Sequence, residues 1–204
     1  MRIIIGMIAA SALMAGAASA ETRAHSGFTS VSAAGRVTVE IVVGPQYSVA
    51  LTGPRVDNVI TRVEGGELQI EPRQNRRGGR ARDAHVRITM PDLQGLDVAA
   101  GAEVDAREIS ADAFLLDVSS GASVDVAGRC GVLRLDISSG ASARAQRLQC
   151  ADVRADASSG ANATVYASSS ISVDGSSGAS LRWAGDASVR SLDLSSGASA
   201  RRLN

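Results

Sequence analysis

Ser119-Ser120-Gly121-Ala122-Ser123 is one of six copies of a five-residue motif that fills the second half of the chain. The copies begin at Ala99, Ser119, Ser138, Ser158, Ser176 and Ser195, and their glycines are 20, 19, 20, 18 and 19 residues apart. Self-similarity at a nearly fixed period is typical of a solenoid, in which each repeat buries its apolar face only against its neighbours. The motif therefore predicts an architecture and says little about chemistry.

The residues around each motif glycine alternate with the period of a β-strand. Apolar side chains fill most positions five and three residues before the glycine, as Leu116 and Val118 do before Gly121, and alanine follows the glycine in every copy. Apolar residues at every second position predict strands. The Ser-Ser-Gly step predicts a corner, where glycine tolerates an unusual backbone and a close approach of the next turn.

A period of about 19 residues predicts an all-β fold, a parallel β-helix whose coils stack about 4.8 Å apart. We expect about six coils of 18–20 residues, each with three short strands and three corners. The hexapeptide pattern of left-handed β-helices is absent, which favours a right-handed coil. The core must be thin, because the chain has only one Trp, two Tyr and two Phe.

The chain divides into three segments. Residues 1–20 have the features of a signal peptide, with Arg2, an apolar stretch and the cleavage site Ala18-Ser19-Ala20. Residues 21–92 read as short strands separated by turns, which predicts an N-terminal β-region that caps the β-helix, either as a small domain or as irregular first coils. Residues 93–204 hold the β-helix repeats. No segment after the signal peptide is long enough to span a bilayer as a helix.

The charge balance excludes a general attraction to nucleic acid. Without Arg2, the chain has 20 Arg, no Lys and 21 acidic residues. Phosphate binding needs an excess of positive charge, so we expect no nucleic-acid partner.

An aspartate stands four residues before every motif glycine, between two inward apolar positions. This aspartate row consists of Asp97, Asp117, Asp136, Asp156, Asp174 and Asp193. Two unit charges about 5 Å apart repel by about 0.9 kcal/mol in water, so the row needs compensation. Structural compensation would come from Arg134 and Arg154, from the motif serines, or from backbone N–H groups. The functional alternative is a row of calcium sites, which the absence of the nine-residue calcium repeat disfavours.

Two further groups of residues are candidates for a defined role. Cys130 and Cys150 each lie ten residues before a motif glycine, so we expect a disulfide between adjacent coils, with two buried thiols as the alternative. An arginine-rich stretch is either an anion-binding loop for acidic polysaccharide or lipopolysaccharide, or a solvated hairpin loop; it contains Arg73, Arg76, Arg77, Arg80 and Arg82. His25 and His85 lack metal-ligand spacing, and no serine lies in a nucleophile elbow, so we expect no catalytic residue, metal or cofactor.

The mature chain also resembles a known family. The residues that carry the resemblance are Gly27-Phe28-Thr29-Ser30-Val31, the run from Gly35 to Ile41 with Gly44 and Tyr47-Ser48-Val49, then Gly66-Glu67-Leu68-Gln69-Ile70, Val86-Arg87-Ile88-Thr89-Met90-Pro91 and the Ser-Gly-Ala-Ser repeats. This pattern is similar to the bacterial head GIN domain, whose members are described as putative auto-transporter adhesins. The resemblance implies an exported β-helical domain without an established molecular activity. The repeats and their cap occupy the mature chain, so we expect no membrane barrel for self-transport.

Together these features predict an exported, non-enzymatic cell-envelope protein of a Gram-negative bacterium, in the periplasm, at the cell surface or outside the cell. Its role would be adhesion, surface binding or scaffolding, with a cell-surface polysaccharide or another envelope protein as partner. The alternative is a carbohydrate-active enzyme, a polysaccharide lyase or hydrolase, although evenly repeated acids differ from the local cluster that such chemistry needs. A monomer is favoured over an end-to-end dimer, because Arg201 and Arg202 place positive charge on the last coil.

Overall fold

The computed structural model describes residues 20–73 and 84–203. They form a β-solenoid of about five turns, which confirms the predicted β-helix; its right-handed sense stays a prediction. Apart from a 3-10 helix at Val56–Asn58, the elements are strands. They are β1 (Glu21–Arg23), β2 (Ser30–Ala34), β3 (Val37–Val43), β4 (Ser48–Thr52), β5 (Val59–Glu64), β6 (Glu67–Pro72), β7 (Ala84–Met90), β8 (Gly95–Ala99), β9 (Glu103–Val118), β10 (Ser123–Ile137), β11 (Ser142–Ala157), β12 (Asn162–Gly175), β13 (Ser180–Ala184), β14 (Ser188–Leu194) and β15 (Ser199–Arg202).

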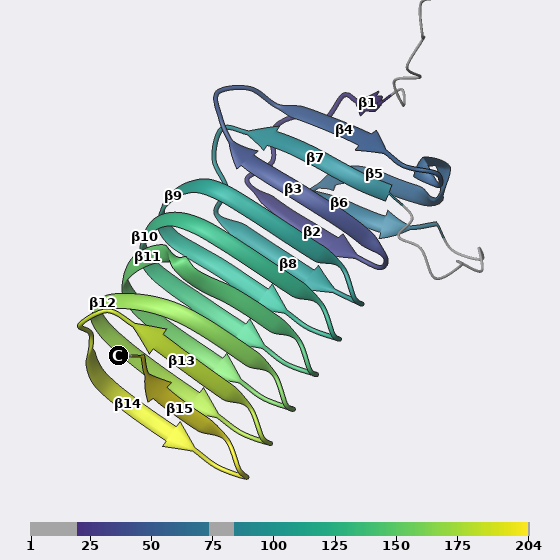
Figure 1. Ribbon diagram of the computed structural model, residues 1–204. Helices are drawn as coiled ribbons and strands as arrows, with labels where there is room; N and C mark the ends of the chain where they lie inside the picture. Colours follow the sequence, from purple (N-terminus) through teal and green to yellow (C-terminus); the bar gives the residue numbers. More distant parts are fainter. Residues whose placement is uncertain (1–19, 74–83, 204) are drawn as a thin grey trace, which may run out of the picture.

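The regular turns stack in parallel and in register. Each of β9 to β12 is one long strand that runs along one face of the solenoid, bends, and returns along the other face (Figure 1). We call one face the aspartate face; it consists of residues 95–99, 114–118, 133–137, 153–157 and 171–175 with β14. The opposite face consists of residues 103–107, 123–126, 142–145 and 162–166 with β13 and β15.

The motif makes a tight corner in all six copies, through Ser-Ser-Gly in five of them and Ala99-Ala100-Gly101 in the first, as predicted. In the corner at Ser119, both Ser120 (φ 52°) and Gly121 (φ 70°) have positive φ, and the Ala122 amide donates to the Ser119 carbonyl at 3.0 Å. Two consecutive residues with positive φ are the pattern of a type I′ turn. Glycine is favoured here by its backbone conformation alone, because a Cβ at any motif glycine would meet nothing within 4 Å. The prediction that the next turn approaches these glycines closely is therefore wrong.

The expectation of three corners per coil is also wrong. Each regular turn has one tight corner, and the second change of direction is a wider bend inside the long strand, where the register shifts. Close backbone approach occurs at this bend. A Cβ on Gly128 (φ 142°) would lie 2.1 Å from the Ile109 carbonyl oxygen, so only glycine fits there.

The core is a single thin layer of small and branched side chains between the two faces. The alanines that follow the motif glycines in the first five copies are at most 2% exposed, which confirms that they turn inward. They belong to one buried cluster that runs from Phe28 to Ala187. A core this thin depends on close contact between successive turns.

The N-terminal coils are not stacked in sequence order. β2 pairs in parallel with both β6 and β8, and β3 pairs with both β7 and β9. The β2–β3 arch therefore lies between the outermost coil, formed by β6 and β7, and the first regular turn. Antiparallel pairing of β4 with β7 and of β5 with β6 covers the N-terminal edge (Figure 1).

At the C-terminal end of the solenoid β15 covers β13, whereas β14 leaves its inner side chains uncovered. Val189 and Leu192 are in register with the buried Ile171 and Val173, yet they are 49% and 42% exposed. This end of the solenoid is therefore apolar and open within the described chain. No helix among the described residues is long and apolar enough to cross a membrane.

Candidate functional site

The aspartate row lies in register along the aspartate face. Strand pairing places each member opposite the next, from Asp97 and Asp117 through to Asp174 and Asp193. All six residues are exposed, because inward apolar side chains on either side turn them outward. The predicted row therefore exists as a continuous line of carboxylates across six strands.

Three carboxylates of the row have raised pKa values. Partial burial raises the pKa of Asp117, and the neighbouring carboxylates of Asp97 and Asp136 raise this pKa further. Partial burial likewise raises the pKa of Asp156, with smaller effects from its two neighbours in the row. At Asp97, partial burial raises the pKa and Glu67 adds to the effect. These three aspartates therefore bind protons more tightly than isolated aspartates do.

A groove of about 520 Å³ follows the row on its side away from the corners. Its lining combines Asp97, Asp117, Asp136 and Asp156 with Arg134, Arg154, Gly95 and Leu115. Leu115 is 54% exposed, and it is in register with Gly95 on one side and Arg134 on the other. The groove thus offers carboxylate acceptors, guanidinium donors and an apolar surface in adjacent lines.

The described residues do not provide the compensation expected for the row. Arg134 and Arg154 are stacked in register beside it, but among the described residues neither forms an ion pair within 4.0 Å. The motif serines make no side-chain hydrogen bond to the aspartates in the part of the chain that the structure describes. The described residues also contain no group of three or more His, Cys, Asp or Glu side chains that could hold a metal ion.

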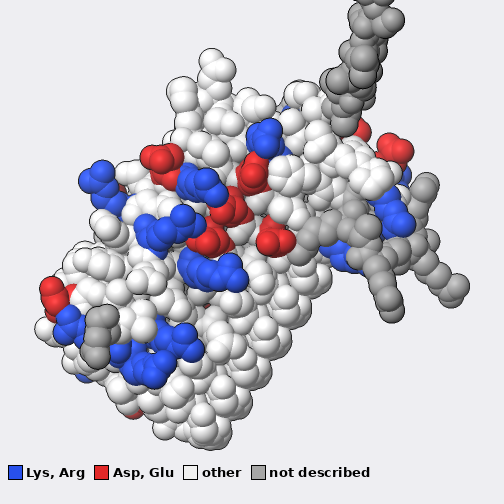
Figure 2. Space-filling view, in the orientation of Figure 1, with Lys and Arg blue, Asp and Glu red and all other residues white. Residues whose placement is uncertain are grey.

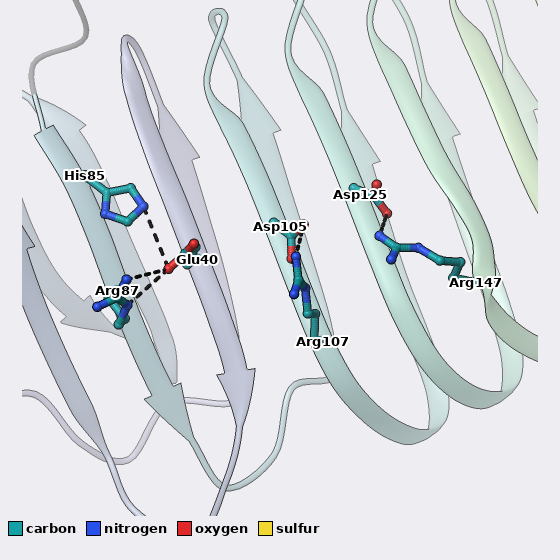
Figure 3. Close-up of polar contacts among 7 residues, drawn as sticks. All are labelled: Glu40, His85, Arg87, Asp105, Arg107, Asp125 and Arg147. Atoms are coloured by element: carbon teal, nitrogen blue, oxygen red, sulfur yellow. Dashed lines mark hydrogen bonds and ion pairs between the residues drawn. The ribbon is translucent and has the colours of Figure 1, made fainter.

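On the opposite face, acidic side chains form ion pairs with arginines. Acidic and basic side chains are intermixed across its middle, as Figure 2 shows. Arg87 binds Glu40 at 3.0 Å, with His85 3.8 Å from the same carboxylate. In Figure 3, Asp105 and Asp125 also each have an arginine partner: Arg107 at 2.7 Å and Arg147 at 2.8 Å. These three acids are thus paired, whereas the aspartate row on the other face has no such partner among the described residues.

The two cysteines are joined. Cys130 and Cys150 are opposite one another on β10 and β11, with Cα atoms 4.4 Å apart and a bond between their sulfur atoms. The disulfide lies at the wide bend and ties two successive turns together. Neither cysteine lines the groove beside the aspartate row.

The arginine-rich stretch lies largely outside the described residues. This applies to Arg76, Arg77, Arg80 and Arg82, whereas Arg73 is described at the end of β6, where its amide donates to the Asn58 carbonyl at 2.7 Å. Arg73, Arg23 and His25 line a small pocket. The predicted anion-binding loop therefore stays a prediction.

Comparisons with solved structures agree with this fold. The chain is similar to a putative adhesin from Bacteroides fragilis NCTC 9343, with a TM-score of 0.74 and 14% identity over 90% of this chain and 96% of that one. It is also similar to a putative adhesin from Parabacteroides merdae ATCC 43184, with a TM-score of 0.52 and 11% identity over 93% of this chain and 98% of that one. No curated protein matches the chain in sequence.

A family model covers most of the sequence. It matches residues 27–187, which include the N-terminal coils and five of the six motif corners. This match confirms the resemblance drawn from the Gly-Phe-Thr-Ser-Val run and the Ser-Gly-Ala-Ser repeats. The chain belongs to the family described as "Putative auto-transporter adhesin, head GIN domain".

Proposed function

We propose that this protein is an exported, non-enzymatic component of the cell envelope that binds a surface polysaccharide along its aspartate face. One observation carries the proposal: the same outward carboxylate recurs in register on six successive strands. A reaction needs one set of unlike groups at one place. A row of equivalent groups instead suits a ligand that itself repeats, because each repeat adds a contact at high effective concentration.

The chemistry of the groove favours a sugar polymer. Carboxylates accept hydrogen bonds from hydroxyl groups, and the guanidinium groups of Arg134 and Arg154 donate them. Leu115 supplies an apolar surface for the C–H side of a sugar ring. The family description and the name of the Bacteroides fragilis structure both include the word adhesin, which supports a role in surface binding.

Two features support export. Residues 1–20, nearly all outside the described part of the chain, have the composition of a cleavable signal peptide. The Cys130–Cys150 disulfide is of a kind that persists in oxidising compartments such as the periplasm. Fractionation of the native host should therefore find the shortened chain in the envelope or the medium. Full-length protein in the cytoplasm would contradict export.

A glycan array with the purified protein tests the binding role. We expect binding to a subset of envelope polysaccharides, and we expect the Asp117→Asn, Asp136→Asn double variant to weaken it by about tenfold or more. The Asp105→Asn variant is the control, since it removes a partly exposed carboxylate from the opposite face. Equal loss in both variants, or binding to no glycan, would contradict the proposal.

The same glycans test the alternative of a carbohydrate-active enzyme. Incubation with any bound polysaccharide should leave its chain length unchanged, and neither new reducing ends nor unsaturated uronate should form. Turnover that disappears in the Asp117→Asn, Asp136→Asn variant would show that the row is a reaction centre and that the non-enzymatic proposal is wrong.

A further inference from the structure

The opposite face has a second row of outward side chains, and its charge changes sign along the solenoid. Strand register aligns one outward residue of β3 with one residue from each later strand of this face. In order from the N-terminal end, the row reads Glu40, Asp105, Asp125, Arg144, Thr164, Arg182 and Arg201. The first three members are acidic and the later ones are basic or neutral.

The two halves of the row differ in their partners. Each acid has an arginine within 3.0 Å. By contrast, Arg144, Arg182 and Arg201 are exposed and form no ion pair with any described residue. Two more arginines lie beside them, but Arg147 holds Asp125 and Arg202 holds Asp186. This part of the face therefore has five arginines and two aspartates, and both aspartates are already bound.

The three unpaired cations are close together. Arg182 and Arg201 are opposite one another on adjacent strands, about 4.8 Å apart along the solenoid, and like charges in this position repel. Arg144 lies two strands further on, across Thr164. Figure 2 shows the resulting basic cluster over β13 and β15. An anion bound between the guanidinium groups would relieve the repulsion.

A polar groove lies between Arg144 and Arg182. It has a volume of about 220 Å³, and its lining adds Ser142, Asn162, Thr164 and Ser180 to the two arginines. The hydroxyl groups and the amide can donate to carboxylate or hydroxyl oxygens. Guanidinium groups bind carboxylates in a bidentate manner. The groove therefore has the donors that an acidic sugar requires.

We infer that this groove, held between Arg144 and Arg182 and extended by Arg201, binds the carboxylates of an acidic polysaccharide. A polymer fits because the cations form a line across four strands, two strands or about 9.6 Å separating Arg144 from Arg182. The lining has no aromatic side chain on which a nucleic-acid base could stack. It also has no exposed apolar side chain that could enter a lipid bilayer.

This inference deepens the proposed surface-binding function by naming an acidic ligand on the face opposite the aspartate row. The two proposals can fail separately, because their test variants change different faces. Loss of binding in Asp117→Asn, Asp136→Asn concerns only the aspartate face, whereas the experiment below changes only arginines.

The test measures binding of the purified protein to polygalacturonate at about 0.1 M salt. The Arg144→Gln, Arg182→Gln double variant should bind at least about tenfold more weakly than the wild type. The Arg62→Gln, Arg129→Gln double variant is the matched control. It removes the same charge from two exposed arginines that line neither the groove beside the aspartate row nor the groove between Arg144 and Arg182, and it leaves the arginine-rich stretch intact, so it should bind as the wild type does.

Three outcomes would overturn the inference: undiminished binding in the Arg144→Gln, Arg182→Gln variant, equal weakening in the control, or tighter binding to phosphatidylglycerol vesicles or a single-stranded oligonucleotide than to polygalacturonate. Neutral dextran should not bind. Melting followed through Trp183, the only tryptophan, verifies that the variants are folded. If the double variant does not fold, Arg182→Gln alone should still weaken binding measurably, and an unchanged affinity would overturn the inference.

Discussion

Asp117 and Asp136 are opposite one another on adjacent strands of the aspartate face, and no described cation lies within 4.0 Å of either carboxylate. Each also faces a further aspartate on its other side, Asp97 and Asp156 respectively. Because one pair of charges at this spacing repels by about 0.9 kcal/mol in water, the ionised row destabilises the fold at neutral pH.

Asp117→Asn should therefore stabilise the protein at neutral pH. The substitution keeps the shape of the side chain and removes its repulsion with two neighbours. We expect a gain of about 1 kcal/mol, which corresponds to a rise in Tm of about 2 to 4 °C. Asp105→Asn, which breaks an ion pair with Arg107, should give no such rise. Calorimetry at low salt is the measurement, and a lower Tm for Asp117→Asn would contradict the unrelieved row.

Three aspartates of the same row determine the sign of the pH dependence of stability. The pKa values of Asp97, Asp117 and Asp156 are raised above the ordinary value of 3.8 in the folded state. Around these pKa values the folded state therefore binds more protons than the unfolded state does. Stability contributed by these groups is gained as the pH falls through their folded pKa values and lost as it rises through them. Asp117→Asn should flatten this part of the profile.

Calcium should leave the Tm almost unchanged. The described residues contain no group of three or more potential metal ligands, and calcium needs six to eight oxygen ligands. Melting in millimolar calcium and in chelator tests this expectation. A shift of several degrees that depends on calcium concentration would show a cation bound to the native row.

Ala161→Glu should prevent folding. Ala161 is fully buried directly after the motif glycine at the fourth corner, and a lone carboxylate there would lie in a thin apolar core. The adjacent substitution Asn162→Glu places the same charge at an exposed position and should be tolerated. Circular dichroism and solubility distinguish the two, and a soluble Ala161→Glu protein of normal stability would contradict the packing described above.

The motif made these corners predictable, because its spacing identifies both the turn and the inward alanine. It also predicted that the aspartates would align. The same spacing also predicts the alignment of three arginines, which was missed: Arg144, Arg182 and Arg201 each lie four residues after a motif glycine. At this offset Asp105 and Asp125 stand in two earlier copies, so the change of sign was visible without a structure.

The N-terminal coils were harder to predict for a physical reason. β2 lies between β6 and β8, so its neighbours come from distant parts of the sequence, and no repeat marks their register. The wide bend was missed because it lies within continuous strands. Its signal is glycine outside the motif, at Gly128 and Gly131, where neighbouring backbone leaves no room for a side chain.

The disulfide should contribute to stability by constraining the unfolded chain. Cys130 and Cys150 are 20 residues apart, and closing a loop of this length is worth about 3 kcal/mol in the chain-entropy model. The Cys130→Ala, Cys150→Ala variant should lower the free energy of unfolding by up to this amount and still fold. Mass spectrometry of unreduced peptides from envelope protein should recover the linked pair, whereas two free thiols in quenched material would contradict it.

Exposed apolar side chains and arginines lie together at the C-terminal edge of the solenoid, and they have opposite effects on the pairing of two copies. Val189, Leu192 and Leu194 are 49%, 42% and 38% exposed, which favours pairing of this edge with a second copy. The exposed Arg190 and Arg201 oppose that pairing because like charges from two copies would meet. We therefore expect a monomer at moderate salt and increasing dimerisation as added salt screens the arginines.

Light scattering across a range of salt concentrations measures this balance. Arg201→Ser should shift dimerisation to lower salt, because it removes part of the repulsion. Leu192→Ser, Leu194→Ser should abolish dimerisation, because it removes much of the apolar surface that would be buried. A wild-type protein that is already dimeric at low salt, and that stays dimeric after the leucines are replaced, would show that a different surface joins the two copies.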